Sequence, residues 1–95
     1  MSNEMVLEWD EEKRQRNIVE HGIDFVEAVE VLFDTNVSIV PDGRKDYGEK
    51  RFNAYGLSNG RRLRMCFTMR GDAVRVITMF KVHNKEWEKY YEKNN

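Results

Sequence analysis

Three polar side chains at helical spacing are the first candidates for chemistry in this chain. Lys13, Asn17 and His21 follow one another at intervals of four residues, which places them on one face of a helix. Histidine titrates near neutral pH and serves as a general acid or base, while lysine supplies a positive charge. Two plainer interpretations stay open: Lys13 as a solvated surface residue, and His21, directly before Gly22, as a cationic cap at a helix end.

The chain lacks the sequence patterns of most other catalytic classes. It has no nucleophile-elbow spacing, no phosphate-cradling glycine loop and no two histidines four residues apart. Cys66 is the single cysteine, and no Cys/His group has zinc-ligand spacing, so we expect neither a metal nor a cofactor. Metal-free acid–base chemistry remains. Cleavage of RNA by its own 2′-hydroxyl is such a reaction, because it needs only a base, an acid and cations that stabilise charge on the phosphorane.

A tight turn fixes the pairing of two predicted strands. Asn59-Gly60 favours a type I′ hairpin turn, which needs positive φ at both central residues. Pairing outward from this turn sets Tyr55 opposite Arg64 and Asn53 opposite Cys66.

A second predicted hairpin follows directly. If it is centred on Gly71-Asp72, Thr68 stands opposite Arg75 and Cys66 stands opposite Ile77. The two hairpins then agree on which side chains share a face.

These registers predict one apolar and one polar sheet face, because strand side chains alternate. The apolar face, which helices must cover, carries Phe52, Ala54, Leu63, Met65, Phe67, Met69, Val74, Val76 and Phe80. The polar face carries Arg51, Asn53, Tyr55, Arg62, Arg64, Thr68 and Arg75. Guanidinium groups match phosphate geometry and a tyrosine ring can stack on a base, so the polar face favours nucleic-acid binding. A solvated face whose arginine stems cover apolar surface is the alternative.

Capping residues predict the helices that position these groups. Asp10 is a favourable N-cap for a helix that ends at Gly22, Asp24 and Glu27 form a capping-box pattern for a second, and a last helix starts at His83. Predicted strands lie at 37–40, 51–57, 62–69 and 73–80. The expected fold is α+β in the order ααββββα, with an antiparallel sheet of about four strands packed on helices on one face.

Charge is distributed unevenly along the chain. The 95 residues have a net charge of −1, yet residues 1–35 hold ten acids and three bases, whereas residues 36–81 hold four acids and ten bases. We expect the acidic helices and the basic sheet face to lie on opposite sides, which would focus an anionic substrate onto the sheet. The length favours a single domain over residues 1–95. Without a signal-peptide or membrane-spanning pattern, the cytoplasm is the expected location.

The assembled residues resemble the BrnT toxins of bacterial type II toxin–antitoxin systems. The resemblance extends from about Leu7 to Tyr91. It is carried by Trp9-Asp10-Glu11-Glu12-Lys13, Asn17, His21-Gly22-Ile23-Asp24-Phe25, Glu27-Ala28, Arg51 before Gly56, and Arg75-Val76-Ile77 leading to Lys81, Glu86 and Tyr90.

The resemblance implies a RelE-like ribonuclease that cuts RNA without a metal and arrests translation. It also implies a BrnA-like antitoxin partner with a ribbon-helix-helix DNA-binding portion, through which alone the complex would contact DNA. Together with the sheet register, it predicts catalytic roles for Lys13, His21, Arg51, Arg75 and Lys81. The predicted substrate-binding residues are Asn17, Asn53, Tyr55 and Arg64.

One position departs from the family pattern. Where BrnT proteins commonly read Ser-Ala-Arg, this chain reads Thr78-Met79-Phe80 followed by Lys81. Lys81 can supply a point charge but not a bidentate fork. Two alternatives to a full ribonuclease therefore stay open: a weakened homologue that acts mainly through antitoxin binding and operon autoregulation, and an RNA-binding module without chemistry.

Overall fold

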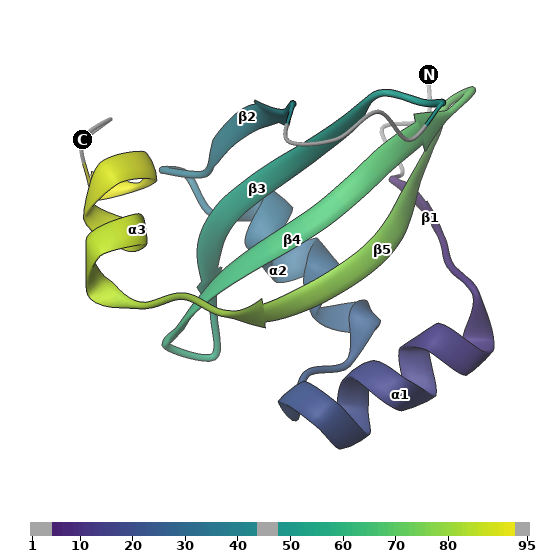
Figure 1. Cartoon of the computed structure of the whole chain (residues 1–95), viewed down its shortest axis with the longest axis horizontal. Coiled ribbons are helices and arrows are strands. Elements are labelled where there is room, and N and C mark those ends of the chain that lie inside the picture. The colour runs from purple at the N-terminus through teal and green to yellow at the C-terminus, as the bar shows by residue number, and fades with distance from the viewer. Residues whose placement is uncertain (1–4, 44–47, 93–95) are drawn as a thin grey trace.

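A five-stranded mixed sheet with three α-helices forms the part of the chain that the computed structural model describes, residues 5–43 and 48–92 (Figure 1). The elements are β1 (Val6–Glu8), α1 (Glu11–His21), the 3-10 turn η1 (Phe25–Glu27), α2 (Ala28–Phe33), β2 (Ser38–Asp42), β3 (Arg51–Ser58), β4 (Arg61–Arg70), β5 (Ala73–Lys81) and α3 (Asn84–Tyr90). The strand order is β1-β5-β4-β3-β2. Within the described ranges, no helix has the length and apolar character needed to cross a membrane.

The α+β class is confirmed, and the predicted antiparallel sheet of about four strands agrees roughly with the observed mixed sheet of five. β1 adds a fifth strand and pairs in parallel with β5, with Leu7 opposite Val74. The other neighbours are antiparallel, as predicted. A strand of three residues is too short to show the alternating pattern by which strands are predicted.

The caps of the first two helices form as predicted. The side chain of Asp10 accepts a hydrogen bond from the Lys13 backbone N–H (3.1 Å), and Gly22 ends α1 in the left-handed conformation at φ 69°. Asp24 and Glu27 form the complete capping box. This box opens the 3-10 turn η1, which continues into the short helix α2.

The first hairpin has the predicted register. Asn59 and Gly60 adopt φ values of 52° and 75°, as a type I′ turn requires. Tyr55 pairs with Arg64, and Asn53 pairs with Cys66.

The second hairpin departs from its predicted register halfway along. Thr68 pairs with Arg75 as expected, but a bulge between Cys66 and Phe67 places Cys66 opposite Thr78 instead of Ile77. The extra residue in β5 reverses the facing of every later side chain. The prediction that Phe80 belongs to the apolar face is therefore wrong: its neighbour Met79 is fully buried there.

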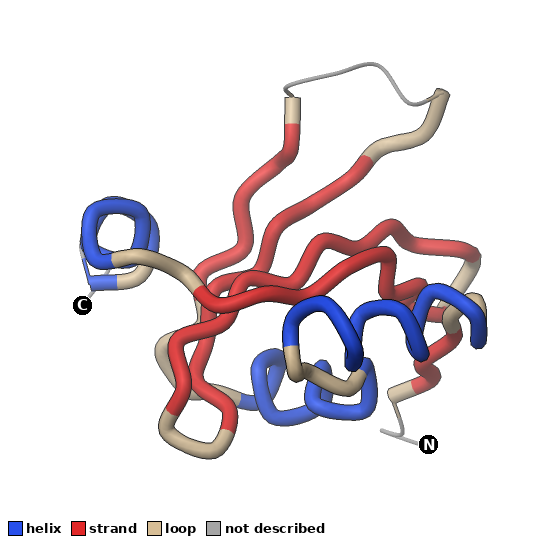
Figure 2. The backbone as a smooth tube through the Cα atoms, turned by 60° about the horizontal axis from the view of Figure 1, so that its bottom comes forward, coloured by secondary structure: helices blue, strands red, loops and turns tan. Residues whose placement is uncertain are grey.

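Helices α1 and α2 cover one side of the sheet, which we call the helix face (Figure 2). The core on this face consists of Ile23, Phe25, Ala28, Val31, Ala54, Leu63, Met65, Phe67, Val76 and Met79. α2 packs so closely on β3 that a Cβ added at Gly56 would lie 2.7 Å from the carbonyl oxygen of Val31. Glycine is required at this position because it has no side chain.

On the opposite side of the sheet, the open face, the described residues form a covering helix at one end. There Trp87 and Tyr90 of α3 and its C-cap residue Tyr91 pack with Tyr55 and Val82 in a second apolar cluster. The predicted packing of helices on one face therefore holds for α1 and α2 but not for α3. After the bulge in β5, the chain continues through Val82 to α3, and both pack on the open face.

Candidate functional site

The open face carries the predicted polar residues in three rows across the strands. The first row contains Asp42, Arg51, Thr68, Arg75 and Glu8, the second Val40, Asn53, Cys66 and Thr78, and the third Ser38, Tyr55, Arg64 and Phe80. The sheet therefore gathers Arg51, Asn53, Tyr55, Arg64 and Arg75 on one face, as their register predicts.

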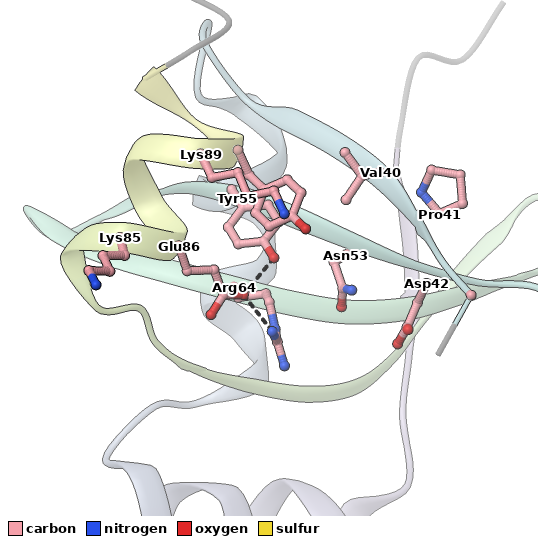
Figure 3. A pocket seen from close by; sticks show the side chains of 11 residues that line it. Val40, Pro41, Asp42, Asn53, Tyr55, Arg64, Lys85, Glu86 and Lys89 are labelled. Atoms are coloured by element: carbon pink, nitrogen blue, oxygen red, sulfur yellow. Dashed lines mark hydrogen bonds and ion pairs between the residues drawn. The ribbon is translucent and has the colours of Figure 1, made fainter. Parts of the chain in front are cut away.

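A carboxylate from α3 contacts two residues of the third row. The Oε2 atom of Glu86 accepts a hydrogen bond from the Tyr55 hydroxyl at 2.6 Å and another from Arg64 Nη1 at 2.5 Å (Figure 3). Burial of the phenol, together with its bond to Glu86, raises the pKa of Tyr55 well above its ordinary value. Tyr55 therefore stays protonated and donates to the carboxylate.

Tyr55 is less accessible than its predicted role in base stacking suggests. Its side chain is 2% exposed, and its ring stacks on Tyr90 with centroids 4.9 Å apart. In this arrangement its hydroxyl positions Glu86, while its ring supports α3.

Phe80 connects the open face to the end of α1. The guanidinium carbon of Arg64 lies 4.1 Å from the Phe80 ring centroid, and the His21 ring lies 5.8 Å from the same ring. A cation over an aromatic face is attracted to it, so the Phe80 ring helps to hold the Arg64 guanidinium in place.

A cleft of about 420 Å³ opens between α3 and strands β2 to β4. It is lined by Val40, Pro41, Asp42, Gly43, Asn53, Tyr55, Arg64, Lys85, Glu86, Lys89 and Tyr90. Two buried atoms in this lining, Asn53 Oδ1 and Arg64 Nε, have no hydrogen-bond partner among the described residues. Buried polar groups are nearly always paired, so these two atoms are exceptions that need an explanation.

Lys13, Asn17 and His21 meet in a smaller cleft of about 200 Å³ between α1 and β5. Their common helix face is thus as predicted. Lys13 and His21 are exposed, which leaves both accessible to a ligand.

Asn17 is buried in the wall of that cleft, and its amide bonds to protein groups. Its Nδ2 donates to the carbonyls of Ile23 (2.9 Å) and Met79 (2.8 Å). Its Oδ1 accepts from the Met79 N–H and from the Thr78 hydroxyl, both at 3.2 Å. Because β1 pairs with β5 only up to Arg75, Asn17 takes the place of a neighbouring strand at the free edge of β5.

The two remaining arginines pair with carboxylates. Arg75 Nη1 lies 3.3 Å from Glu8 Oε1, and Arg51 Nε lies 3.2 Å from Glu49 Oε2. Both arginines are half-buried, and Arg75 pairs with Thr68.

Lys81 lies apart from this set. It pairs with Leu63 at the end of β5, and this register directs it to the helix face. The structure does not bring Lys81 together with the arginines of the open face.

Glu86 is the central residue that our sequence-based site prediction missed. It stands four residues before Tyr90, so both share one side of α3, and both contact Tyr55. The alternating charges of the terminal helix hide this signal, because they are equally typical of a solvated helix.

Comparison with protein families identifies a match over most of the chain. Residues 9–86 match the family model described as the ribonuclease toxin, BrnT, of type II toxin–antitoxin systems. A search of curated proteins found no significant match to the chain. The matched segment contains all of the predicted site residues and the whole lining of the cleft between α1 and β5, whereas Lys89 and Tyr90 of the larger cleft follow it.

Proposed function

The chain belongs to the BrnT family of ribonuclease toxins of type II toxin–antitoxin systems, and we propose from this premise that it is a metal-independent endoribonuclease that cleaves mRNA and arrests translation. The observation that carries the proposal is the Tyr55–Glu86–Arg64 cluster on the open face. It combines a carboxylate with a fixed guanidinium, which are the proton acceptor and the cation that this chemistry needs. A RelE-like fold and a cytoplasmic location are part of the same proposal.

In the proposed reaction, Glu86 removes the proton from the 2′-hydroxyl of the RNA. The 2′-oxygen attacks the adjacent phosphorus, and the bond between phosphorus and the 5′-oxygen breaks. Arg64 stabilises the negative charge of the phosphorane. His21 donates a proton to the departing 5′-oxygen, so the products are a 2′,3′-cyclic phosphate and a 5′-hydroxyl.

The remaining predicted residues bind and orient the strand in this scheme. Arg51 and Arg75 lie two strand spacings apart, about 10 Å, and contact phosphates on either side of the cleaved bond. Their carboxylate partners Glu49 and Glu8 are partly exposed, and such pairs are weak, so a phosphate can replace them at low cost. Lys13 and Lys81 add positive charge near the bound strand. Asn17 positions α1 and lines the smaller cleft between α1 and β5.

Expression of the chain alone tests the proposal. We expect growth arrest in bacteria and new transcript ends, and we expect the purified chain to cut RNA in the presence of a metal chelator. Glu86→Gln and Arg64→Ala should abolish both effects, whereas Glu88→Gln, an exposed change on the same helix, should not. Normal growth with intact RNA on expression of the wild-type chain would contradict the proposal.

The partner that we propose is a BrnA-like antitoxin with a ribbon-helix-helix DNA-binding portion. An acidic segment of such a partner would dock on the open face and α3, where it would exchange with the carboxylates that now neutralise Arg51 and Arg64. Charge reversal at both arginines should therefore prevent formation of the complex. A complex that survives this double change would refute the docking site.

A weakened toxin that acts mainly through its antitoxin is the second candidate. It is favoured by the pairing of each of Arg51, Arg64 and Arg75 with a glutamate, which reduces the positive potential of the open face. Autoregulation of the operon by an intact complex, without any RNA cleavage by the free chain, would identify this candidate.

A further inference from the structure

The cleft between α3 and the sheet contains an unsatisfied acceptor and an unsatisfied donor. Asn53 is 6% exposed, and its Oδ1 atom is buried without a hydrogen-bond partner in the described part of the chain. Arg64 Nε is in the same condition on the neighbouring strand β4. Figure 3 shows both side chains directed into the same cleft.

Both side chains are held in place by their surroundings. Arg64 is fixed by Glu86 at Nη1 and by the Phe80 ring against its guanidinium. Asn53 projects from the middle of β3, between Val40 on β2 and Cys66 on β4. A rigid donor–acceptor pair in a cleft is suited to a ligand with a complementary planar edge.

We propose that this cleft binds one unstacked nucleobase of the RNA strand and that Asn53 determines which base is accepted. A carboxamide reads a base edge by donating from Nδ2 and accepting at Oδ1. Arg64 Nε supplies one further donor. The inference rests on the proposed ribonuclease function, and it adds the recognition of the base to it.

The walls and the rim of the cleft suit a nucleotide rather than a small anion. Val40 and Tyr90 provide apolar surface on two sides, which a planar base can cover. Lys85 and Lys89 stand four residues apart on α3 at the rim, where they can contact the phosphates on either side of the base. A volume of about 420 Å³ is sufficient for a single base with its sugar.

Binding without cleavage is the direct test. We would measure the affinity of the full chain for non-cleavable 2′-O-methyl trimers in which the outer positions are abasic and the central position is A, G, C, U or abasic. We expect about a tenfold preference for one base over the others, and weaker binding of the fully abasic trimer. Equal affinity for all five trimers would overturn the proposal.

A change of the reading group tests the role of Asn53. In Asn53→Asp the Nδ2 donor becomes an acceptor, so we expect a different order of base preference among the four base-containing trimers. Asn84→Asp, an exposed change whose side chain contacts Arg62 outside the cleft, should preserve the wild-type order. The same order in Asn53→Asp as in the wild type would refute the assignment.

A measurement on the wild-type chain covers the case in which Asn53→Asp does not fold. The side-chain amide NMR signal of Asn53 should shift with the preferred trimer and stay in place with the abasic one. An unchanged signal would refute the inference. Base preference in a chain that cuts no RNA would disprove the proposed ribonuclease alone, whereas cleavage without base preference would disprove the base subsite alone.

Discussion

The guanidinium carbon of Arg64 lies 4.1 Å from the ring centroid of Phe80, so the central arginine of the open face rests on an aromatic ring. The bulge in β5 creates this contact, because it moves Phe80 from the helix face to a position opposite Arg64. The residue that departs from the family pattern is thus a structural support for a neighbouring cation.

Substitution of Phe80 separates this supporting role from the loss of an arginine. Phe80→Arg places a second guanidinium beside Arg64 and near His21, and we expect like-charge repulsion to lower RNA cleavage at least about tenfold. Phe80→Leu removes the aromatic ring without adding charge, so the cation–π attraction to Arg64 and the ring contact with His21 are lost, and we expect a decrease of about two- to fivefold. Cleavage rates of the purified variants decide the matter. Higher activity in Phe80→Arg would support the weakened-toxin candidate.

Asn17 should affect stability before it affects catalysis. Its amide forms four hydrogen bonds that connect α1 to the edge of β5. In Asn17→Ala the backbone groups of Met79 lose their partners, which costs about 1–3 kcal/mol for each buried group left unsatisfied. We expect the urea midpoint of Asn17→Ala to fall clearly while that of Lys13→Ala stays unchanged. Equal midpoints would show that Asn17 acts only on substrate.

The contact between α2 and β3 is equally open to test. In Gly56→Ala the new methyl group would lie 2.7 Å from the Val31 carbonyl oxygen, and backbone atoms cannot move away easily. We expect a loss of about 1–3 kcal/mol in the free energy of unfolding. Gly43→Ala is the matched control, because no atom lies within 4 Å of its added Cβ. Similar melting temperatures for both variants would contradict the close packing.

The parts of the fold that depend on local signals could be predicted from the sequence. Asn59-Gly60 specifies a type I′ turn, and this turn alone fixes the pairing of Tyr55 with Arg64. Asp10 and Gly22 mark the ends of α1 for the same reason, because caps act within a few residues.

The parts that depend on tertiary contacts could not be predicted. No local residue signals the bulge near Ile77, and β1 forms only because β5 offers an edge. The role of Glu86 depends on where α3 packs against the sheet. This packing involves Tyr55 and Trp87, which are far apart in the sequence but belong to the same apolar cluster. The predicted site therefore contains the sheet residues but lacks the carboxylate at its centre.

Tyr55 gives the site a measurable dependence on alkaline pH. Its pKa is raised in the folded state by burial and by Glu86, so its contribution to stability is complete below the ordinary tyrosine pKa of about 10. This contribution declines as the pH rises further, because the unfolded chain then ionises first. Urea unfolding of wild type and Tyr55→Phe from pH 8 to 11 should show a stability difference that shrinks above pH 10. A constant difference would contradict the shift.

Glu86 is the residue for which substrate binding and catalysis should change in opposite directions. Its carboxylate forms an ion pair with Arg64, so it competes with an RNA phosphate for this guanidinium. The proposed mechanism nevertheless needs the same carboxylate as the base. Glu86→Gln keeps a hydrogen-bond acceptor for Tyr55 but removes the charge. We expect tighter RNA binding together with a fall in kcat of about 10²–10⁴. A residue that only anchors α3 would instead weaken both RNA binding and stability. Comparison of kcat, KM and urea midpoints with those of Glu88→Gln distinguishes the two roles, and wild-type kcat in Glu86→Gln would exclude this carboxylate as the base.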